Sequence, residues 1–448
     1  MSYKPFIYKI PSSNVSDIYK NNSIISSSNI EQPLFSLGFH SFIHRTKSAM
    51  VITNKLETKN KFYYIVNPFE HNINDYEKDI AHVSESFLNK TDRDNIPILS
   101  RAFYKMWEML YLFDIASKDK MCMVGLAEGP GSFIQSFVEF REQYFDPAND
   151  TVYGLTINSD NMMNINKTMI DSINSRYENM INVIKTTKDM KGGAKTIKGS
   201  RTLKNELNTN GDLTQVNTIK YLKENVRQKA YLITADGGFE WKNENYQEQE
   251  AYTLILGEII SAVSLQAKGG SFVLKVFETF THITIKLITL LTSFYEEVYV
   301  YKPFFSRATN SEKYIICKNF KDNDNMKHIA LLEETLQKCY KAMYNDKLFI
   351  NDIFPDYNIS QEQLNIFKYI NINIANIQQI MINNLVVYIK SNNYFGDSYH
   401  SYREQQIKAN KWWIDYFLTD KLVSQESLLK ETVKYNDSEI NLFVKKLL

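Results

Sequence analysis

The chain has 448 residues, and its composition, 44% hydrophobic and 23% charged, excludes a collagenous or wholly disordered protein. Single hydrophobic cores stop growing at roughly 250–300 residues, so this length predicts two or three structural units. The 52 lysine and arginine residues almost balance the 51 aspartate and glutamate residues, so attraction to a polyanion such as RNA must come from local clusters of charge.

The cysteines and the apolar runs argue against an extracellular or membrane protein. The three cysteines form no CxxC pair and indicate neither a disulfide framework nor a zinc site; they are Cys122, Cys317 and Cys339. The first residues hold no apolar run of signal-peptide length. The longest apolar stretches, 251–267 and 283–295, contain Glu258 and Lys286 and fall short of the about 20 residues that span a bilayer. We expect no membrane partner and a reducing compartment, the cytoplasm or nucleus, or the host cytoplasm or virion if the chain is from a large DNA virus.

The chain divides into three regions by its pattern. Residues 1–84 mix a β-like run at 62–66 with a Ser/Asn-rich stretch at 21–29, which predicts an irregular N-terminal extension or small lobe. From 85 to 320, strand-length apolar runs alternate with amphipathic segments, as in a Rossmann-like α/β fold with helices on both faces of a parallel sheet. The predicted strands are 121–126, 151–157, 231–235, 271–276, 297–301 and 313–318.

Residues 321–448 are predicted to be a helical C-terminal region without strands, because apolar residues recur there at three- and four-residue intervals. The predicted helices are 329–344, 361–390, 404–418 and 426–435. An aromatic stripe on the third of them favours core packing over a recognition surface; it comprises Trp412, Trp413, Tyr416 and Phe417.

A glycine-rich turn, GLAEGPGSF at 125–133, follows the strand at 121–126 and precedes a helical run at 134–141. Glycines at such a turn let a ligand approach the backbone and the helix N-terminus. The GxGxxG pattern of dinucleotide-binding proteins and the Gly-Lys-Ser/Thr of a P-loop are both missing, which disfavours NAD and a cradled triphosphate. A purely structural turn remains an alternative.

Two charged residues mark the ends of neighbouring predicted strands. Asp236 closes the strand in LITADGG, and the carboxyl ends of strands line the ligand crevice of an open α/β sheet. Lys275 lies inside the apolar strand GSFVLKVF, where a lysine needs a partner, and Asp236 is the available one. A turn or helix-capping aspartate and a structurally paired lysine are the simpler alternatives.

Two further candidates are ordinary by themselves. Glu312 precedes the last predicted strand, where a surface glutamate is common. Lys105 lies on an amphipathic helical segment, where most lysines are solvated.

Taken together, six segments in order resemble the FtsJ-like RNA 2′-O-ribose methyltransferases, in the branch that acts on the mRNA cap. They are SRAFYK, EGPGSF, GDLT, ADGGF, GGSFVLKVF and SRATNSEKYIIC, and the resemblance covers residues 100–320. It implies a Rossmann-like methyltransferase fold that uses S-adenosyl-L-methionine. The family's Lys-Asp-Lys-Glu catalytic tetrad then falls on Lys105, Asp236, Lys275 and Glu312.

The resemblance also implies cofactor contacts. These fall on Glu128, Gly129, Pro130, Gly131, Ser132, Phe133, Asp212 and Asp236. Asp212 is expected beside the adenine, while Ser132 replaces a common glycine of the family. The second strand lacks the usual acid that holds the ribose hydroxyls, and Asn158 or Asp160 are the substitutes.

The tetrad suits methyl transfer to a ribose hydroxyl, an in-line displacement that needs a positioned oxygen and an acceptor for its proton. A free lysine has a pKa of about 10.4, so a lysine base requires neighbouring cations or burial. We therefore expect Lys275 to be the base or proton relay, Asp236 to hold it, and Lys105 and Glu312 to orient the hydroxyl. The chemistry needs no metal ion, because no phosphoryl group moves and no water is activated.

A basic segment at 185–204 carries seven cations and one acid, Asp189. It predicts sequence-independent contacts with RNA phosphates, or else a solvated surface loop. The expected RNA contacts are Lys191, Lys195, Lys198 and Arg201.

The expected function is 2′-O-methylation of the cap-proximal nucleotide of mRNA, with capped mRNA as partner and the capping or transcription machinery as a further one. The alternatives are the same reaction on ribosomal or transfer RNA, a catalytically idle RNA- or cofactor-binding subunit, and a nicotinamide oxidoreductase.

Overall fold

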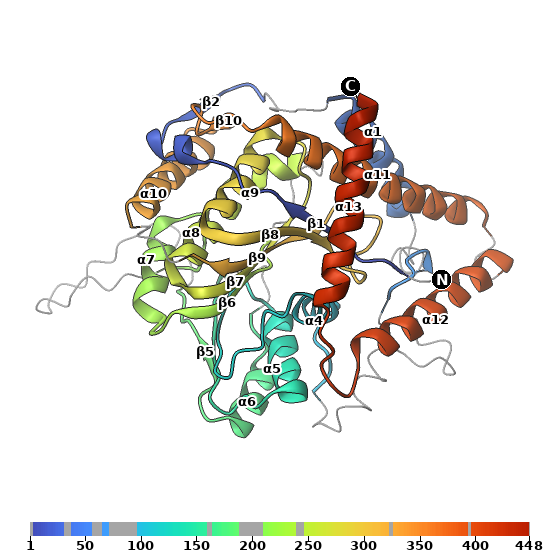
Figure 1. The fold of residues 1–448 in the computed structure, drawn as a ribbon, viewed down its shortest axis with the longest axis horizontal. Helices are drawn as coiled ribbons and strands as arrows, with labels where there is room; N and C mark the ends of the chain where they lie inside the picture. The colour runs from blue at the N-terminus through green and yellow to red at the C-terminus, as the bar shows by residue number, and fades with distance from the viewer. Residues whose placement is uncertain are drawn as a thin grey trace, which may run out of the picture.

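The structure is a computed structural model that describes residues 3–30, 37–55, 65–70, 96–158, 164–187, 209–238, 246–321, 326–392 and 396–447. Within these residues, eight strands form one central sheet in the order β1-β8-β9-β7-β6-β3-β4-β5, and helices cover both of its faces (Figure 1). A separate two-stranded sheet pairs β10 with β2. The α/β class and the Rossmann-like sheet agree with the prediction.

The strands of the central sheet are β1 (Phe6–Ile10), β3 (Cys122–Leu126), β4 (Thr151–Gly154), β5 (Ile181–Val183), β6 (Ala230–Ala235), β7 (Gln266–Val276), β8 (Tyr295–Lys302) and β9 (Lys313–Phe320). β5, β4, β3, β6 and β7 are parallel neighbours, whereas β9 is antiparallel to both β7 and β8, and β1 is antiparallel to β8. The small sheet consists of β2 (Ile24–Ser27) and β10 (Phe349–Ile353).

The central strands form because their side chains are apolar on both faces. In β3, Met123 points into one hydrophobic core and Val124 into the other, and the alternation continues in β6 with Leu232 and Ile233. Strands buried on both faces appear in a sequence as continuous apolar runs, which is why these strands were predictable.

Two groups of helices cover the two faces of the sheet. One face packs against α4 (Ala102–Phe113), α5 (Ser132–Tyr144), α6 (Lys167–Arg176) and α12 (Asp397–Phe417). The other packs against α7 (Val216–Asn225), α8 (Gln247–Leu265), α9 (His282–Phe294), α10 (Met326–Tyr340) and α11 (Gln361–Lys390). Figure 1 shows α5 and α9 on opposite sides of the strands.

The remaining helices lie at the margins of the sheet. α1 (Leu37–Ser48) contacts α11, and α13 (Glu426–Leu447) runs beside β1 (Figure 1). Short turns of other helical types are η1 (Ser16–Lys20), η2 (Ala49–Lys55) and η4 (Lys341–Asn345). Among the described residues, no helix combines the length and apolarity needed to cross a bilayer.

All six predicted strands are present, and the helix at 361–390 has the predicted bounds. Trp413 and Phe417 are fully buried, so core packing of the aromatic stripe is confirmed for these two. The β-like run at 62–66 is not a strand where it is described, at Ile65 and Val66; residues 62–64 lie outside the described part.

Two predictions about the chain outside 85–320 were wrong. The Ser/Asn-rich stretch 21–29 contains strand β2, and strand β10 lies beyond residue 320, where helices alone were expected. The two strands pair with each other, so their backbone hydrogen bonds come from a partner more than 300 residues away in sequence, Phe349 opposite Ser27. Such pairing needs little apolar periodicity, and the sequence pattern therefore missed it.

Candidate active site

The four predicted catalytic residues meet at one end of the sheet. The carboxyl ends of the parallel neighbours β6 and β7 carry Asp236 and Lys275, and the antiparallel β9 brings its amino end, with Glu312, to the same edge. Lys105 reaches this edge from α4. The Lys275 Nζ atom lies 3.1 Å from Asp236 Oδ1, and the Lys105 Nζ atom lies 2.7 Å from Glu312 Oε1.

The two ion pairs differ in their exposure. The side chains of Lys105 and Glu312 are 9% and 10% exposed, whereas the side chain of Asp236 is 21% exposed. Burial raises the pKa of Glu312, but the ammonium groups of Lys105 and Lys275 outweigh this and hold that pKa well below its usual range. Glu312 is therefore a permanent carboxylate, and the more open face of the cluster is the Asp236–Lys275 pair.

The charge of Lys275 is set by three acidic side chains. Burial lowers the pKa of its ammonium group, but Asp236, Glu312 and Glu258 together outweigh burial and raise it above its ordinary value. Lys275 also donates a hydrogen bond of 2.6 Å to the backbone oxygen of Asp236. Lys275 is thus protonated at neutral pH in this structure, because its acidic neighbours stabilise the charged amine more than burial destabilises it.

Tyr314 belongs to the site although the sequence reasoning did not nominate it. It lies directly opposite Lys275 in the antiparallel register of β7 and β9, and its hydroxyl donates to Asp236 Oδ1 at 2.9 Å. Burial and the carboxylates of Asp236 and Glu312 raise the pKa of Tyr314 well above 10, so the hydroxyl keeps its proton. The only signal in the sequence was its place two residues after Glu312.

A second buried lysine shapes the turn before Glu312. Lys302 Nζ donates to the backbone oxygens of Glu312 at 2.8 Å and Asn310 at 3.0 Å, and to Ser306 Oγ at 3.2 Å. Burial lowers the pKa of Lys302 to about 7, although the Glu312 carboxylate opposes the shift. Lys302 fixes the backbone that presents Glu312.

Glu258 lies on α8 behind the Asp236–Lys275 pair. It is 1% exposed, and its Oε1 atom has no hydrogen-bond partner among the described residues. A methyl group at Gly237 would collide with that oxygen, so glycine is what allows the carboxyl group to approach the turn after β6. Burial raises the pKa of Glu258 to about 8, against the opposing effect of Lys275.

The glycine-rich turn is organised by Glu128. Its Oε1 atom accepts hydrogen bonds from the backbone N–H groups of Phe133 at 3.0 Å and Ile134 at 2.9 Å, at the start of α5. Its Oε2 atom is buried without a hydrogen-bond partner among the described residues, and a Cβ atom at Gly125 would lie 2.6 Å from it. Burial raises the pKa of Glu128 to about 8.

The rest of this turn connects the predicted cofactor residues to α4. Gly131 has a φ of +109°, which favours glycine, and its N–H donates to the oxygen of Glu128 at 2.6 Å. The hydroxyl groups of Ser132 and Ser100 lie 2.7 Å apart, which ties the turn to the start of the helix that carries Lys105. The Phe133 side chain is 1% exposed and belongs to the core.

Asp212 and Asn158 come together at the next turn of the sheet edge. Asp212 Oδ1 accepts from the Thr214 N–H at 2.9 Å, so its carboxylate closes its own turn before α7. The Asn158 N–H donates to the Asn210 oxygen at 2.7 Å. The predicted residues Asp160, Lys191, Lys195, Lys198 and Arg201 lie outside the described residues.

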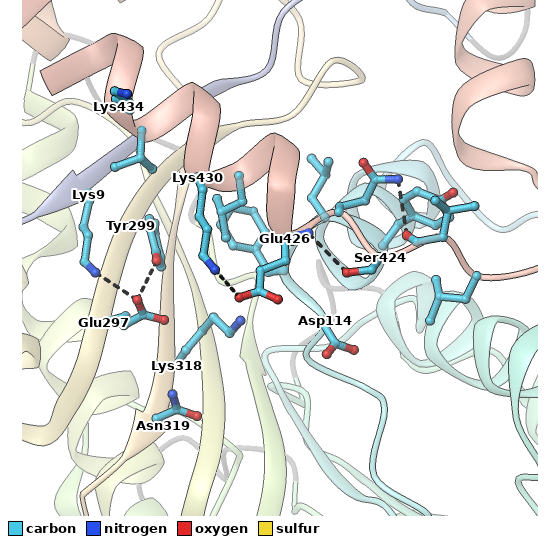
Figure 2. Close-up of a pocket in the computed structure, with 18 of the residues that line it drawn as sticks. Lys9, Asp114, Glu297, Tyr299, Lys318, Asn319, Ser424, Glu426, Lys430 and Lys434 are labelled. Carbon is cyan, nitrogen blue, oxygen red and sulfur yellow. Dashed lines mark hydrogen bonds and ion pairs between the residues drawn. The ribbon is translucent and has the colours of Figure 1, made fainter. Parts of the chain in front are cut away.

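A pocket at the opposite end of the sheet is unrelated to these residues. It has a volume of about 710 Å³ and lies between β1, β8, β9 and α13, with Asp114 and Asn319 at its rim (Figure 2). Two ion pairs lie within it, Lys9 with Glu297 at 2.9 Å and Lys430 with Glu426 at 2.5 Å. We assign it no ligand.

An open α/β sheet with a glycine-rich first turn and lysine–carboxylate pairs at its strand ends is the arrangement of a Rossmann-like methyltransferase. Residues 98–320 match the FtsJ-like methyltransferase family, and the chain belongs to that family over this range.

The curated relatives of the chain have names that refer to the mRNA cap. It is 30% identical over 177 residues to cap-specific mRNA (nucleoside-2′-O-)-methyltransferase 1 of Trypanosoma cruzi, a match that covers 38% of this chain and 48% of the relative. It is 35% identical over 161 residues to the corresponding enzyme of Trypanosoma brucei brucei, a match that covers 34% of this chain and 41% of the relative. Cap-specific mRNA (nucleoside-2′-O-)-methyltransferase 2 of Pongo abelii is 27% identical to the chain over 305 residues, a match that covers 65% of this chain and 37% of the relative. The chain thus spans less than half the length of these relatives.

Among solved structures, a ribosomal RNA methyltransferase from Plasmodium falciparum is similar at 20% identity and a TM-score of 0.32, covering 49% of this chain and 97% of that one.

Proposed function

We propose that this protein transfers a methyl group from S-adenosyl-L-methionine to a ribose 2′-hydroxyl in RNA, at the cap-proximal nucleotide of mRNA. The observation that carries the proposal is the pair of lysine–carboxylate contacts, Lys105–Glu312 and Lys275–Asp236, beside the glycine-rich turn. The FtsJ-like family supports the methyltransferase class, and the names of the curated relatives support the cap as the substrate.

The residues of the first turn fit the cofactor. S-adenosyl-L-methionine supplies a methyl group activated on a sulfonium centre. The buried Oε2 atom of Glu128 has no hydrogen-bond partner among the described residues and is an unsatisfied polar atom in the turn that also contains Gly129 and Gly131. Asp212 and Asn158 line the following turn, where we place the adenosine.

Two ammonium groups can hold the attacking oxygen. In the reaction the carbon–sulfur bond breaks, the oxygen–carbon bond forms, and the hydroxyl proton leaves. The carboxylates of Glu312 and Asp236 fix the amines of Lys105 and Lys275, so both can donate to the ribose oxygen. Such alignment lowers a barrier by about 7–11 kcal/mol, more than a base alone supplies.

Lys275 is the proposed proton acceptor or relay, and the structure adds a condition to that role. The amine has to lose its own proton before it can accept another one. Its raised pKa opposes this loss, whereas a further positive charge placed beside it would lower that pKa again. Lys275 therefore donates a hydrogen bond to the oxygen before transfer, and during transfer it would relay the hydroxyl proton by releasing one of its own protons to solvent at the more open Asp236–Lys275 side of the cluster.

We further propose that four basic residues outside the described part of the chain hold RNA phosphates; they are Lys191, Lys195, Lys198 and Arg201. Proteins of mRNA capping or transcription are the proposed partners, in the cytoplasm or nucleus or, for a viral chain, in the host cytoplasm or virion.

The test is methyl transfer from labelled S-adenosyl-L-methionine by the full chain to matched capped and uncapped RNAs, followed by nuclease digestion. We expect label on a ribose 2′-oxygen next to the cap, and loss of label with uncapped RNA. Equal labelling of uncapped ribosomal or transfer RNA would overturn the cap assignment. Cofactor binding without transfer to any of these RNAs would overturn the activity itself.

A further inference from the structure

A cluster outside the proposed reaction brings together two histidines and a buried carboxylate. His40 and His44 are four residues apart on α1, so they share one face of that helix. Glu278 follows the end of β7 and is 3% exposed. One nitrogen of each ring and one oxygen of the carboxylate all lie within 4.8 Å of one another.

The contact between His44 and Glu278 has a spacing that fits a shared ion as well as a long hydrogen bond. The His44 Nε2 atom lies 3.3 Å from Glu278 Oε2, which is longer than the usual spacing of about 2.9 Å in an N–H···O bond. Two ligands that bind a tetrahedral metal at about 2.0–2.1 Å are about 3.3 Å apart. The ring of His40 lies against that of His44, with 3.7 Å between the centroids.

The second oxygen of Glu278 is held separately. Lys47, one turn after His44 on α1, contacts Glu278 Oε1 and not Oε2. Carboxylates that bind metal ions are commonly oriented by such an outer partner. His40 has no hydrogen-bond partner among the described residues, although it is 8% exposed. The carboxylate is thus oriented, His44 Nε2 faces its second oxygen, and a nitrogen of His40 lies within 4.8 Å of the ligand atoms of both.

We propose that His40, His44 and Glu278 bind a divalent transition-metal ion of the Zn²⁺ class, with the fourth position taken by water. Nitrogen and carboxylate ligands in this number are typical of zinc. The ion clamps α1 to the segment after β7, three residues beyond Lys275. The ion takes no part in methyl transfer, so its binding does not bear on the expectation that methyl transfer needs no metal ion.

Local charge sets the expected affinity. Two lysines, Lys47 and Lys313, lie near two acidic side chains, Glu278 of the cluster and Glu248. The positive and negative charges around the cluster therefore already balance. A bound dication therefore meets repulsion from Lys47. Lys47→Gln keeps a hydrogen-bond donor beside Oε1 and removes one positive charge, and we expect it to bind the ion more tightly than the unaltered chain.

The experiment uses the untagged full chain, stripped with a chelator and titrated with Zn²⁺ by calorimetry and with Co²⁺ by visible absorption. We expect one equivalent to bind, with Co²⁺ bands of a four-coordinate site. His40→Ala and His44→Ala should each weaken binding at least tenfold, while His400→Ala, an exposed histidine on α12, should not change it.

Circular dichroism of every variant separates loss of ligand from loss of fold. The proposal is overturned if the folded chain binds no stoichiometric Zn²⁺, or if both histidine variants bind it as tightly as the unaltered chain does. In either case the cluster is an ion pair between Lys47 and Glu278 with two neighbouring imidazoles. None of these measurements depends on methyl-transfer activity.

Discussion

Lys275 illustrates how single residues in this site are governed by their neighbours. It is held by Asp236 at 3.1 Å and influenced by Glu312 and Glu258, so that its charge is stabilised despite burial. Sequence reasoning identified Lys275 and Asp236 correctly as neighbours. It could not predict the effect of Glu258 on Lys275, because Glu258 lies in the middle of an apolar helix and its approach to Lys275 depends on how α8 packs.

We predict that Lys275→Ala binds S-adenosyl-L-methionine almost normally and loses methyl transfer by about 10²–10⁴-fold, since a positioned proton-transfer group contributes about that much. Calorimetry and a methyl-transfer assay measure the two properties separately. Lys220→Ala, an exposed lysine on α7, is the matched control. Turnover that survives in Lys275→Ala would remove this residue from the mechanism.

Glu258 predicts a pH-dependent stability. Its pKa rises from an unfolded value of about 4.3 to about 8 in the fold, so the folded state binds more protons between these values and loses stability as pH rises. Glu258→Gln removes this loss and keeps the shape. The melting temperature of the variant minus that of the unaltered chain should therefore increase from pH 5 to pH 8. A gap that stays constant over this range would show that Glu258 does not titrate there.

At the level of elements, two glycines with positive φ differ in their surroundings; Gly211 lies in the turn before α7 and Gly269 near the start of β7. Gly211 has a φ of +88°, and a Cβ there would lie 2.5 Å from the backbone oxygen of Thr156, in the loop after β4. Gly269 has a φ of +70° but open space around it. Gly211 is required both for its backbone conformation and for its close approach to Thr156, whereas Gly269 is required for its backbone conformation alone.

Gly211→Ala should therefore destabilise the protein by more than Gly269→Ala, for which left-handed backbone strain of about 1–2 kcal/mol is the main cost. Urea unfolding of the two variants gives the comparison. Gly211→Ala should also weaken cofactor binding, because it displaces the turn that contains Asp212. Equal losses of stability would mean that the Thr156 loop yields freely.

Elements of the sheet were predictable where the chain is buried on both faces. The runs at β3 (CMVGL) and β6 (AYLITA) are almost entirely apolar and β7 contains the buried run FVL, whereas β1 (FIYKI) and β5 (INV) are short or interrupted by polar residues. Their strand character comes from the neighbours with which they pair. Tyr314 was missed for the same reason, since a register across β7 and β9 is not visible in either strand alone.

For the whole molecule, the C-terminal helices are part of the same core as the helix that carries Lys105. Trp413 on α12 is fully buried, and its Nε1 atom donates to Glu108 Oε1 on α4 at 3.0 Å. Glu108 also accepts from the Tyr301 hydroxyl at 2.6 Å, at the end of β8. The aromatic pattern of α12 indicated core packing, but its partner, a buried glutamate on α4, was not predictable from spacing.

Trp413→Ala should cost about 3–5 kcal/mol of unfolding free energy, because it opens a cavity and leaves a buried carboxylate with one donor fewer. Trp412→Ala is the control, since Trp412 is only partly buried and stacks on Tyr416. Urea unfolding at neutral pH measures both. A loss in Trp412→Ala as large as in Trp413→Ala would contradict the assignment of Trp413 to the core.

The position of β1 at the edge of the central sheet has a consequence for biosynthesis. Its ladder partner β8 lies far downstream, with a separation of 288 residues between Lys9 and Glu297. Translation at about 5–20 residues per second places roughly 15–60 s between the appearance of the two strands. During that interval the nascent FIYKI segment has no native partner, and an unpaired apolar strand is open to chaperones and to pairing with other chains. The rate at which ribosomes reach β8 therefore belongs among the determinants of the yield of correctly folded protein.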